Sequence, residues 1–144
     1  MSTQLLPCAC YLKDIIALRK STGTVTGEVL LNGFQQEKNS FRRCSGYVEQ
    51  FDVQTPELTV RETIAFSANL RLDPSNPHIT DDADKMRFVD RIIKIFELTP
   101  LKNVQVGTDD EGGLSFEQRK RLSIAVEFAA SPSILFLDEV SNGH

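Results

Sequence analysis

The sequence has few cysteines, and those it has do not form a metal-binding pattern. Cys8, Cys10 and Cys44 are an odd number without repeated CxxC spacing, and the two histidines, His78 and His144, lie far from them in the chain. Structural zinc sites need four ligands at regular spacings. We therefore do not expect a metal site on these cysteines, and reduced thiols in a cytosolic protein are the simpler interpretation.

The sequence also has no long apolar run and no excess of basic charge. No stretch approaches the ~20 apolar residues that span a bilayer, and the apolar segment 5–12 is short, contains Pro7 and follows no basic segment. These features argue against direct membrane insertion and against a signal peptide. The formal net charge of −4 provides no positive field for nucleic acid. We expect no nucleic-acid partner, and any tie to a membrane must come through a partner or another part of the protein.

The 144 residues are enough for one domain with a modest core. The first part of the chain reads as the end of a helix at 14–20, followed by short strands at 28–32 and 46–49. Asn32-Gly33 closes the first strand and is a strong signal for a hairpin turn.

Two helices are predicted between residues 59 and 100. Thr59 and Glu62 form a capping-box pattern at the first helix start. After a proline-containing loop at 72–78, Thr80 is expected to cap the second helix, and Pro100 stops it. Both segments carry apolar residues at spacings of three and four, which is typical of a helix packed on a core: Val60, Ile64, Ala68, Met86, Val89, Ile93 and Phe96.

The stretch 112–139 is the most informative. Gly112-Gly113 predicts a flexible turn, and Ser115 with Gln118 forms a second capping box. The helix that follows ends before a proline, and the unbroken apolar run 134–137 predicts a strand buried on both faces, as in a parallel sheet. Strand, helix and strand in this order indicate an α/β domain with a largely helical insertion.

Two adjacent carboxylates, Asp138 and Glu139, follow that strand. Open parallel sheets bind ligands beyond the carboxyl ends of their strands. Asp138 is suited to Mg²⁺, and Glu139 to orienting or deprotonating a water. A solvated strand end explains the pair equally well. Ser115 likewise has two interpretations, a plain helix cap and a donor to an anion at the helix start.

The order of these motifs carries more information than any one of them. GGLSFEQRKRLSIAVEFAASPSILFLDE at 112–139 resembles, nearly residue for residue, the signature-to-Walker-B segment of ABC transporter ATPases. The likeness is greatest to the G-type, pleiotropic-drug-resistance branch and its second nucleotide-binding domain, where the signature reads LSxEQRKRL. GEVLLNG at 27–33 and GYVEQFDVQTPELTVRETIAFSANLRL at 46–72 resemble the early hairpin, the Q-loop and the start of the helical subdomain.

The resemblance implies a fold and a set of site residues. It implies a single partial ABC nucleotide-binding domain over 1–144, P-loop NTPase-like, with a parallel sheet core, a helical subdomain at about 59–100, and a signature helix and Walker B strand at 112–139. It implies ATP and Mg²⁺ as cofactors, Glu139 as the catalytic residue, and Asp138 and Gln50 as metal contacts. The implied nucleotide contacts are Gln50, Leu114, Ser115, Phe116, Glu117 and Gln118.

The chain departs from the family pattern at the phosphate loop. The family's GAGKTTLM falls on LPCACYLK at 6–13, which puts Ala9 at the lysine position and Cys10 at the metal-binding hydroxyl position. Lys13 does not rescue the motif, because it lies in the following helix. After Glu139 the chain reads VSNGH where the family continues PTSGLD, and His144 comes too early to be the family's switch histidine. We expect that this chain alone neither binds ATP tightly nor hydrolyses it.

Three interpretations stay open. The chain is an ATPase segment of a transporter that exports small amphipathic compounds, located at the cytoplasmic face of a membrane beside a second nucleotide-binding domain and a transmembrane domain. Alternatively, it is a non-enzymatic partner that lends its signature to another domain's site. The third interpretation is an incomplete product without a stable role, cytoplasmic if made alone, whose sheet edges and apolar faces stay exposed.

Overall fold

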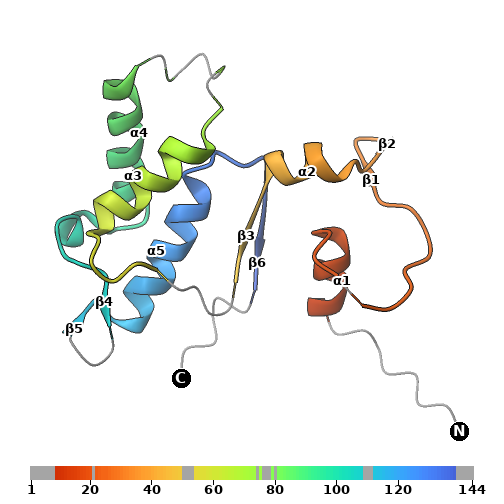
Figure 1. Cartoon of the computed structure of the whole chain (residues 1–144), viewed down its shortest axis with the longest axis horizontal. Coiled ribbons are helices and arrows are strands. Elements are labelled where there is room, and N and C mark those ends of the chain that lie inside the picture. The colour runs from red at the N-terminus through yellow and green to blue at the C-terminus, as the bar shows by residue number, and fades with distance from the viewer. Residues whose placement is uncertain are drawn as a thin grey trace, which may run out of the picture.

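A computed structural model describes residues 9–20, 22–49, 54–73, 75, 79, 81–108 and 112–138. The described residues form helices and short strands (Figure 1), with the bounds given next. In chain order they are α1 Ala9–Ile16, β1 Leu30–Leu31, β2 Phe34–Gln35, α2 Lys38–Cys44, β3 Ser45–Val48, α3 Val60–Arg71, α4 Asp82–Ile95, the 3₁₀ turn η1 Thr99–Leu101, β4 Gly107–Thr108, β5 Gly112–Gly113, α5 Phe116–Phe128 and β6 Ile134–Leu137.

The parallel pair β3 and β6 organises the fold. Tyr47 lies opposite Phe136 in the register, and the amide of Asp138 donates to the carbonyl of Val48 at 3.0 Å, which continues the ladder past the end of β6. The sheet lies between α5 on one side and α1 on the other (Figure 1). This arrangement confirms the predicted α/β class with a parallel sheet, and it places the chain after each strand at the same edge.

The prediction that β6 is buried on both faces is wrong. Its residues are partly exposed, and the Leu137 side chain is 47% exposed. Within the described ranges β6 pairs with β3 alone, so its other edge carries no neighbouring strand that would cover it. An unbroken apolar run indicates a strand here, but the burial of its side chains depends on what packs against the two faces of the sheet.

Helix starts are set by side-chain caps. Both predicted capping boxes are confirmed. The Thr59 hydroxyl accepts from the Glu62 amide, and the Ser115 hydroxyl accepts from the Gln118 amide. In return, the side chains of Glu62 and Gln118 accept from the backbone amides of Thr59 and Ser115. The prediction for α4 was wrong by one residue, because Asp81 rather than Thr80 caps it through the Asp84 amide at 2.6 Å. An aspartate cap also places a negative charge against the positive end of the helix dipole.

The apolar core lies among α3, α4 and α5 rather than at the sheet. The three helices contact one another (Figure 1), and their inward faces have the predicted spacing of three and four. Phe96 and Phe128 close one side, with ring centroids 5.7 Å apart. The buried members on these helices are Val60, Ile64, Ala68, Val89, Ile92, Ile93, Leu122 and Ala125.

Glycines shape two short antiparallel pairs. The Asn32-Gly33 turn is confirmed between β1 and β2, with φ of 51° and 85° as a tight hairpin turn requires. Gly112-Gly113 is not the flexible turn that the sequence predicts. It forms β5, which pairs with β4, and a Cβ on Gly113 would lie 2.4 Å from the Val106 carbonyl oxygen. This glycine is needed for close backbone approach.

Glu127 joins the helical part to the sheet. Its carboxylate accepts two bonds from the Arg71 guanidinium, at 2.6 and 2.8 Å, and one from the Tyr47 amide at 3.1 Å. Beside it, the Ser67 hydroxyl donates to the Val126 carbonyl at 2.8 Å. One side chain of α5 therefore holds the end of α3 and a strand of the sheet together.

Among the described residues, none of the helices has both the length and the apolar character needed to cross a membrane.

Replacing Glu127 should destabilise the fold more than replacing an exposed partner of arginine. We expect Glu127→Ala to lower the free energy of unfolding by about 1–2 kcal/mol, because it leaves the Arg71 charge and the Tyr47 amide without their acceptor. Asp90→Ala is the matched control, since Asp90 also binds an arginine in two-pronged fashion but is half exposed. It should cost about 0.5 kcal/mol. Urea unfolding of both variants tests the difference, and equal losses would contradict the bridging role.

Candidate functional site

The start of α5 presents Ser115 to solvent. Its hydroxyl accepts the Gln118 amide at 3.3 Å, and the Ser115 amide donates to the Gln118 side chain at 2.9 Å. A hydroxyl has one hydrogen to donate and two lone pairs, so the cap uses an acceptor position and leaves the hydrogen for a ligand. The capping box does not use the amides of Phe116 and Glu117, which point along the positive end of the helix dipole.

The other residues of the predicted signature divide into packed and exposed ones. Leu114 is buried in the helical core, so its side chain anchors the segment and faces away from solvent. Phe116 is 52% exposed, with the Lys120 ammonium 5.7 Å from its ring centroid. Glu117 binds Arg121 one turn along at 2.5 Å. The exposed surface at this helix start therefore consists of Ser115, Phe116 and the carboxylate of Glu117.

The end of β6 carries a polar cluster that sequence reasoning did not find. Lys13 of α1 contacts one oxygen of Asp138, and the Tyr47 hydroxyl lies 3.2 Å from the other. The same hydroxyl lies 2.7 Å from Asp14 Oδ1, so its single hydrogen is shared between two carboxylates. Arg19 stacks on the Tyr47 ring, with its guanidinium carbon 4.0 Å from the centroid.

The charges in this cluster stabilise one another. Burial opposes the charged form of Lys13, but hydrogen bonds with Asp138 and Tyr47 outweigh it and raise the pKa of that lysine. The Lys13 contact lowers the pKa of Asp138, against the opposite effect of burial. Burial and the bond to Asp14 raise the pKa of Tyr47 to about 12. At neutral pH the cluster therefore holds a lysine cation, an aspartate anion and a neutral phenol.

The arrangement around Asp138 does not fit Mg²⁺. A magnesium ion takes carboxylate oxygens at about 2.0–2.1 Å and carries its own waters. Here an ammonium lies on one oxygen of Asp138 and a phenol hydroxyl on the other. The predicted metal ligand is present at the predicted strand end, but its charge is already compensated from within the chain.

Two predicted site residues, Gln50 and Glu139, lie outside the described residues and stay predictions. Their described neighbours, Glu49 and Asp138, follow β3 and β6 at the same edge of the sheet. Lys120 of α5 reaches this edge, with its ammonium 3.5 Å from the Glu49 carbonyl oxygen, and it contributes to lowering the pKa of Asp138. The start of α5 and the end of β6 thus lie at the same end of the molecule (Figure 1).

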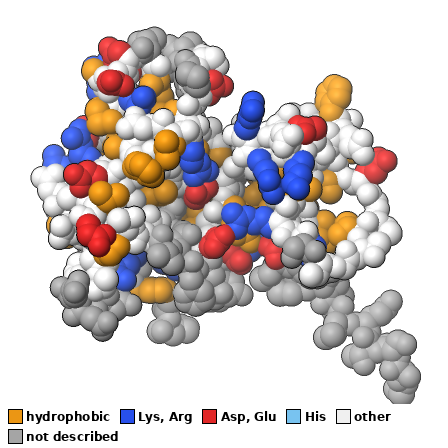
Figure 2. Space-filling model, in the orientation of Figure 1, with side chains coloured by type: hydrophobic (Ala, Val, Ile, Leu, Met, Phe, Trp, Pro, Cys, Tyr) orange, Lys and Arg blue, Asp and Glu red, His pale blue; other side chains and the backbone are white. Residues whose placement is uncertain are grey.

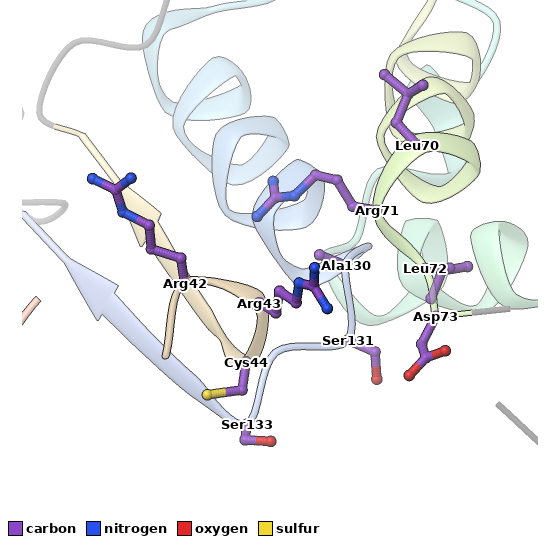
Figure 3. A pocket seen from close by; sticks show the side chains of 10 residues that line it. All are labelled: Arg42, Arg43, Cys44, Leu70, Arg71, Leu72, Asp73, Ala130, Ser131 and Ser133. Atoms are coloured by element: carbon purple, nitrogen blue, oxygen red, sulfur yellow. The ribbon is translucent and has the colours of Figure 1, made fainter. Parts of the chain in front are cut away.

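A cavity of about 670 Å³ opens at the opposite end of the sheet. Basic side chains gather around α2 on this face (Figure 2). The cavity is nevertheless not uniformly basic, because the carboxylate of Asp73 also lines it and Arg71 is bound to Glu127. In the close-up, Arg42 and Arg43 point in different directions (Figure 3). None of the predicted site residues lines this cavity. Its lining is Arg42, Arg43, Cys44, Leu70, Arg71, Leu72, Asp73, Ala130, Ser131 and Ser133.

The Lys13 contact was missed because the sequence shows no link between α1 and the strand end. The expectation that Lys13 lies in a helix rather than in a phosphate loop is confirmed, since α1 spans Ala9–Ile16. The sequence offers only the adjacent cation and anion Lys13-Asp14, which do not indicate a partner after β6.

Comparison with known proteins agrees with the motifs. Residues 12–142 match the family described as ABC transporter. ABC transporter G family member 38 of Oryza sativa subsp. japonica is 46% identical over 132 residues, and the match covers 92% of this chain and 8% of that protein. ABC transporter G family member 17 of Dictyostelium discoideum is 50% identical over 133 residues, covering 92% of this chain and 9% of that protein.

A third relative carries the other name of the branch. Pleiotropic drug resistance protein 1 of Nicotiana tabacum is 44% identical over 132 residues, covering 92% of this chain and 9% of that protein. The chain spans less than a tenth of the length of these curated relatives. The chain belongs to the ABC transporter family, and the three relatives described here are ABC transporter G family or pleiotropic drug resistance proteins.

Proposed function

We propose that this chain acts in the ATPase part of a G-type ABC transporter, where it offers the start of α5 to a nucleotide held by a second nucleotide-binding domain. The observation that carries the proposal is the contrast between the two ends of its predicted site. Ser115 is exposed at a helix start, whereas Asp138 is neutralised by Lys13. The chain does not hydrolyse ATP with its own residues.

The start of α5 has the chemistry of a phosphate contact. Backbone amides and a serine hydroxyl at the positive end of a helix dipole attract anions. Gly112 and Gly113, both exposed with positive φ, precede it and allow a ligand close to the backbone. Glu117 carries a negative charge on the same turn, and its contact with Arg121 reduces the repulsion that a phosphate would meet.

The chain's own phosphate-binding segment lacks the required groups. Phosphoryl transfer depends on positioned amides, a lysine and a metal-bound hydroxyl around the phosphates. Ala9 and Cys10 stand at the lysine and hydroxyl positions and belong to α1. Lys13, the next lysine along, is engaged with Asp138. If this chain takes part in ATP hydrolysis, the reaction therefore occurs at a site in which a partner domain supplies the phosphate loop.

Adding this chain should restore ATP turnover to a partner domain that lacks its own signature serine. The partner is a G-type nucleotide-binding domain with an intact phosphate loop and an arginine at that serine. We expect phosphate release to rise by roughly tenfold or more on mixing, because positioned donors around the phosphates account for effects of that size. Phosphate release from the mixture measures the effect.

Two variants separate the cap from the phosphate contact. Ser115→Asp keeps a good helix cap but places a carboxylate at the phosphate, so it should abolish the rise. Ser115→Thr keeps both the cap and the hydroxyl and should preserve it. If the unchanged chain does not increase phosphate release, the signature-donor proposal is wrong. If the chain hydrolyses ATP without the partner domain, the proposal that it is catalytically inactive is wrong.

We also propose that the transporter lies with this part at the cytoplasmic face of a membrane, joined to a transmembrane domain, and exports small amphipathic compounds. The support is the tobacco relative, pleiotropic drug resistance protein 1, which is 44% identical to this chain.

Disrupting the coding sequence of this chain should reduce the export of amphipathic compounds. We expect the cells to accumulate more of a cationic amphipathic dye, because an ATPase component of the exporter is removed. Intracellular fluorescence after dye loading measures this, and reintroduction of the coding sequence is the control. Unchanged accumulation across dyes of different charge would count against an exporter.

A further inference from the structure

Asp138 is held in place before any ligand arrives. Its amide donates to the Val48 carbonyl at 3.0 Å, so the sheet ladder fixes its backbone. Its side chain is 27% exposed and lies between the Lys13 ammonium and the Tyr47 hydroxyl. Lys13 is more enclosed, with a side chain 16% exposed, and its ammonium also lies 5.2 Å from the centroid of the Tyr47 ring.

Consecutive residues of α1 make the two halves of this contact. Lys13 binds Asp138 after β6, while Asp14 accepts the hydroxyl of Tyr47 on β3. Both contacts are thus made at the same edge of the sheet by one turn of helix. Arg19, in the segment that follows α1, binds Glu49 directly after β3. The cation on Asp138 therefore comes from a helix that is attached to the sheet at several points.

An ammonium and a divalent cation exclude each other at this carboxylate. Both need to lie within hydrogen-bonding or coordination distance of the same oxygens, and two positive charges a few ångströms apart repel strongly in a partly buried site. The lysine is covalently tethered, so it competes at a high effective concentration without the entropy loss of capturing a free ion.

We propose that Lys13 is a built-in replacement for the divalent cation at Asp138, and that this contact docks α1 on the edge of the β3–β6 sheet. Asp138 then serves as an anchor for a helix in place of a metal ligand. Lys13 and Asp138 lie on the opposite side of the candidate site from Ser115, so their contact does not depend on the signature-donor function. The family's motif pattern does not contain this role for Lys13 and Asp138.

Manganese binding to the whole chain tests the replacement. Mn²⁺ is titrated without nucleotide and followed by electron paramagnetic resonance in the unchanged chain, Lys13→Met, Lys13→Arg and Lys13→Met/Asp138→Asn. We expect Lys13→Met to bind Mn²⁺ at least about tenfold more tightly than the unchanged chain, because no ammonium then occupies the Asp138 oxygen that the ion needs. Lys13→Arg should keep the exclusion, and the double variant should lose the gained site.

The outcomes separate cleanly. Equal Mn²⁺ affinity in Lys13→Met and the unchanged chain would overturn the replacement. If Lys13→Met does not fold, Lys13→Arg and the unchanged chain still test the proposal. Mn²⁺ binding at Asp138 by either of them, identified by its loss on Asp138→Asn, would also overturn the proposal. For docking, a double-mutant cycle on urea unfolding should show coupling between Lys13 and Asp138 of about threefold or more in the equilibrium constant. Additive effects would contradict the docking role.

Discussion

The carboxylate of Glu127 is the constraint on which the arrangement of this molecule depends. The helical core and the two-stranded sheet have little in common in their packing, since one is apolar and buried and the other is half exposed. Glu127 contacts Arg71 from the first and the Tyr47 amide from the second. Because α5 also begins at Ser115 and leads into β6, this contact fixes the candidate signature serine relative to the sheet edge that holds Asp138.

Ser115 and Asp138, at the two ends of the candidate site, have different surroundings. Ser115 retains what a phosphate contact needs: exposure, a capped helix start and glycines before it. Asp138 retains the position of a metal ligand but has a lysine where the ion would lie. This contrast is the basis of our proposal that the chain completes a site that another domain begins and does not carry out phosphoryl transfer by itself.

Local chemistry made much of the fold predictable from sequence. The capping boxes at Thr59 and Ser115 and the turn at Asn32 depend on neighbouring residues, so a short pattern specifies them. Asp138 at a strand end followed from an apolar run and its order in the chain. The exposure of Leu137 was not predictable, because it depends on which distant segments pack against the faces of the sheet. Nor was the Lys13 contact, which joins segments far apart in sequence through a single side chain.

The attachment of α1 differs in kind from that of the other helices. Lys13 and Asp14 of α1, and Arg19 just beyond its end, contact the sheet edge through charged and polar atoms, whereas α3, α4 and α5 meet mainly through apolar side chains. Mobile ions weaken exposed charge pairs over a Debye length of about 8 Å at physiological ionic strength, while they leave apolar burial intact or strengthen it. Rising salt therefore weakens the half-exposed Arg19–Glu49 pair first, acts much less on the more enclosed Lys13–Asp138 pair, and leaves the three-helix core intact.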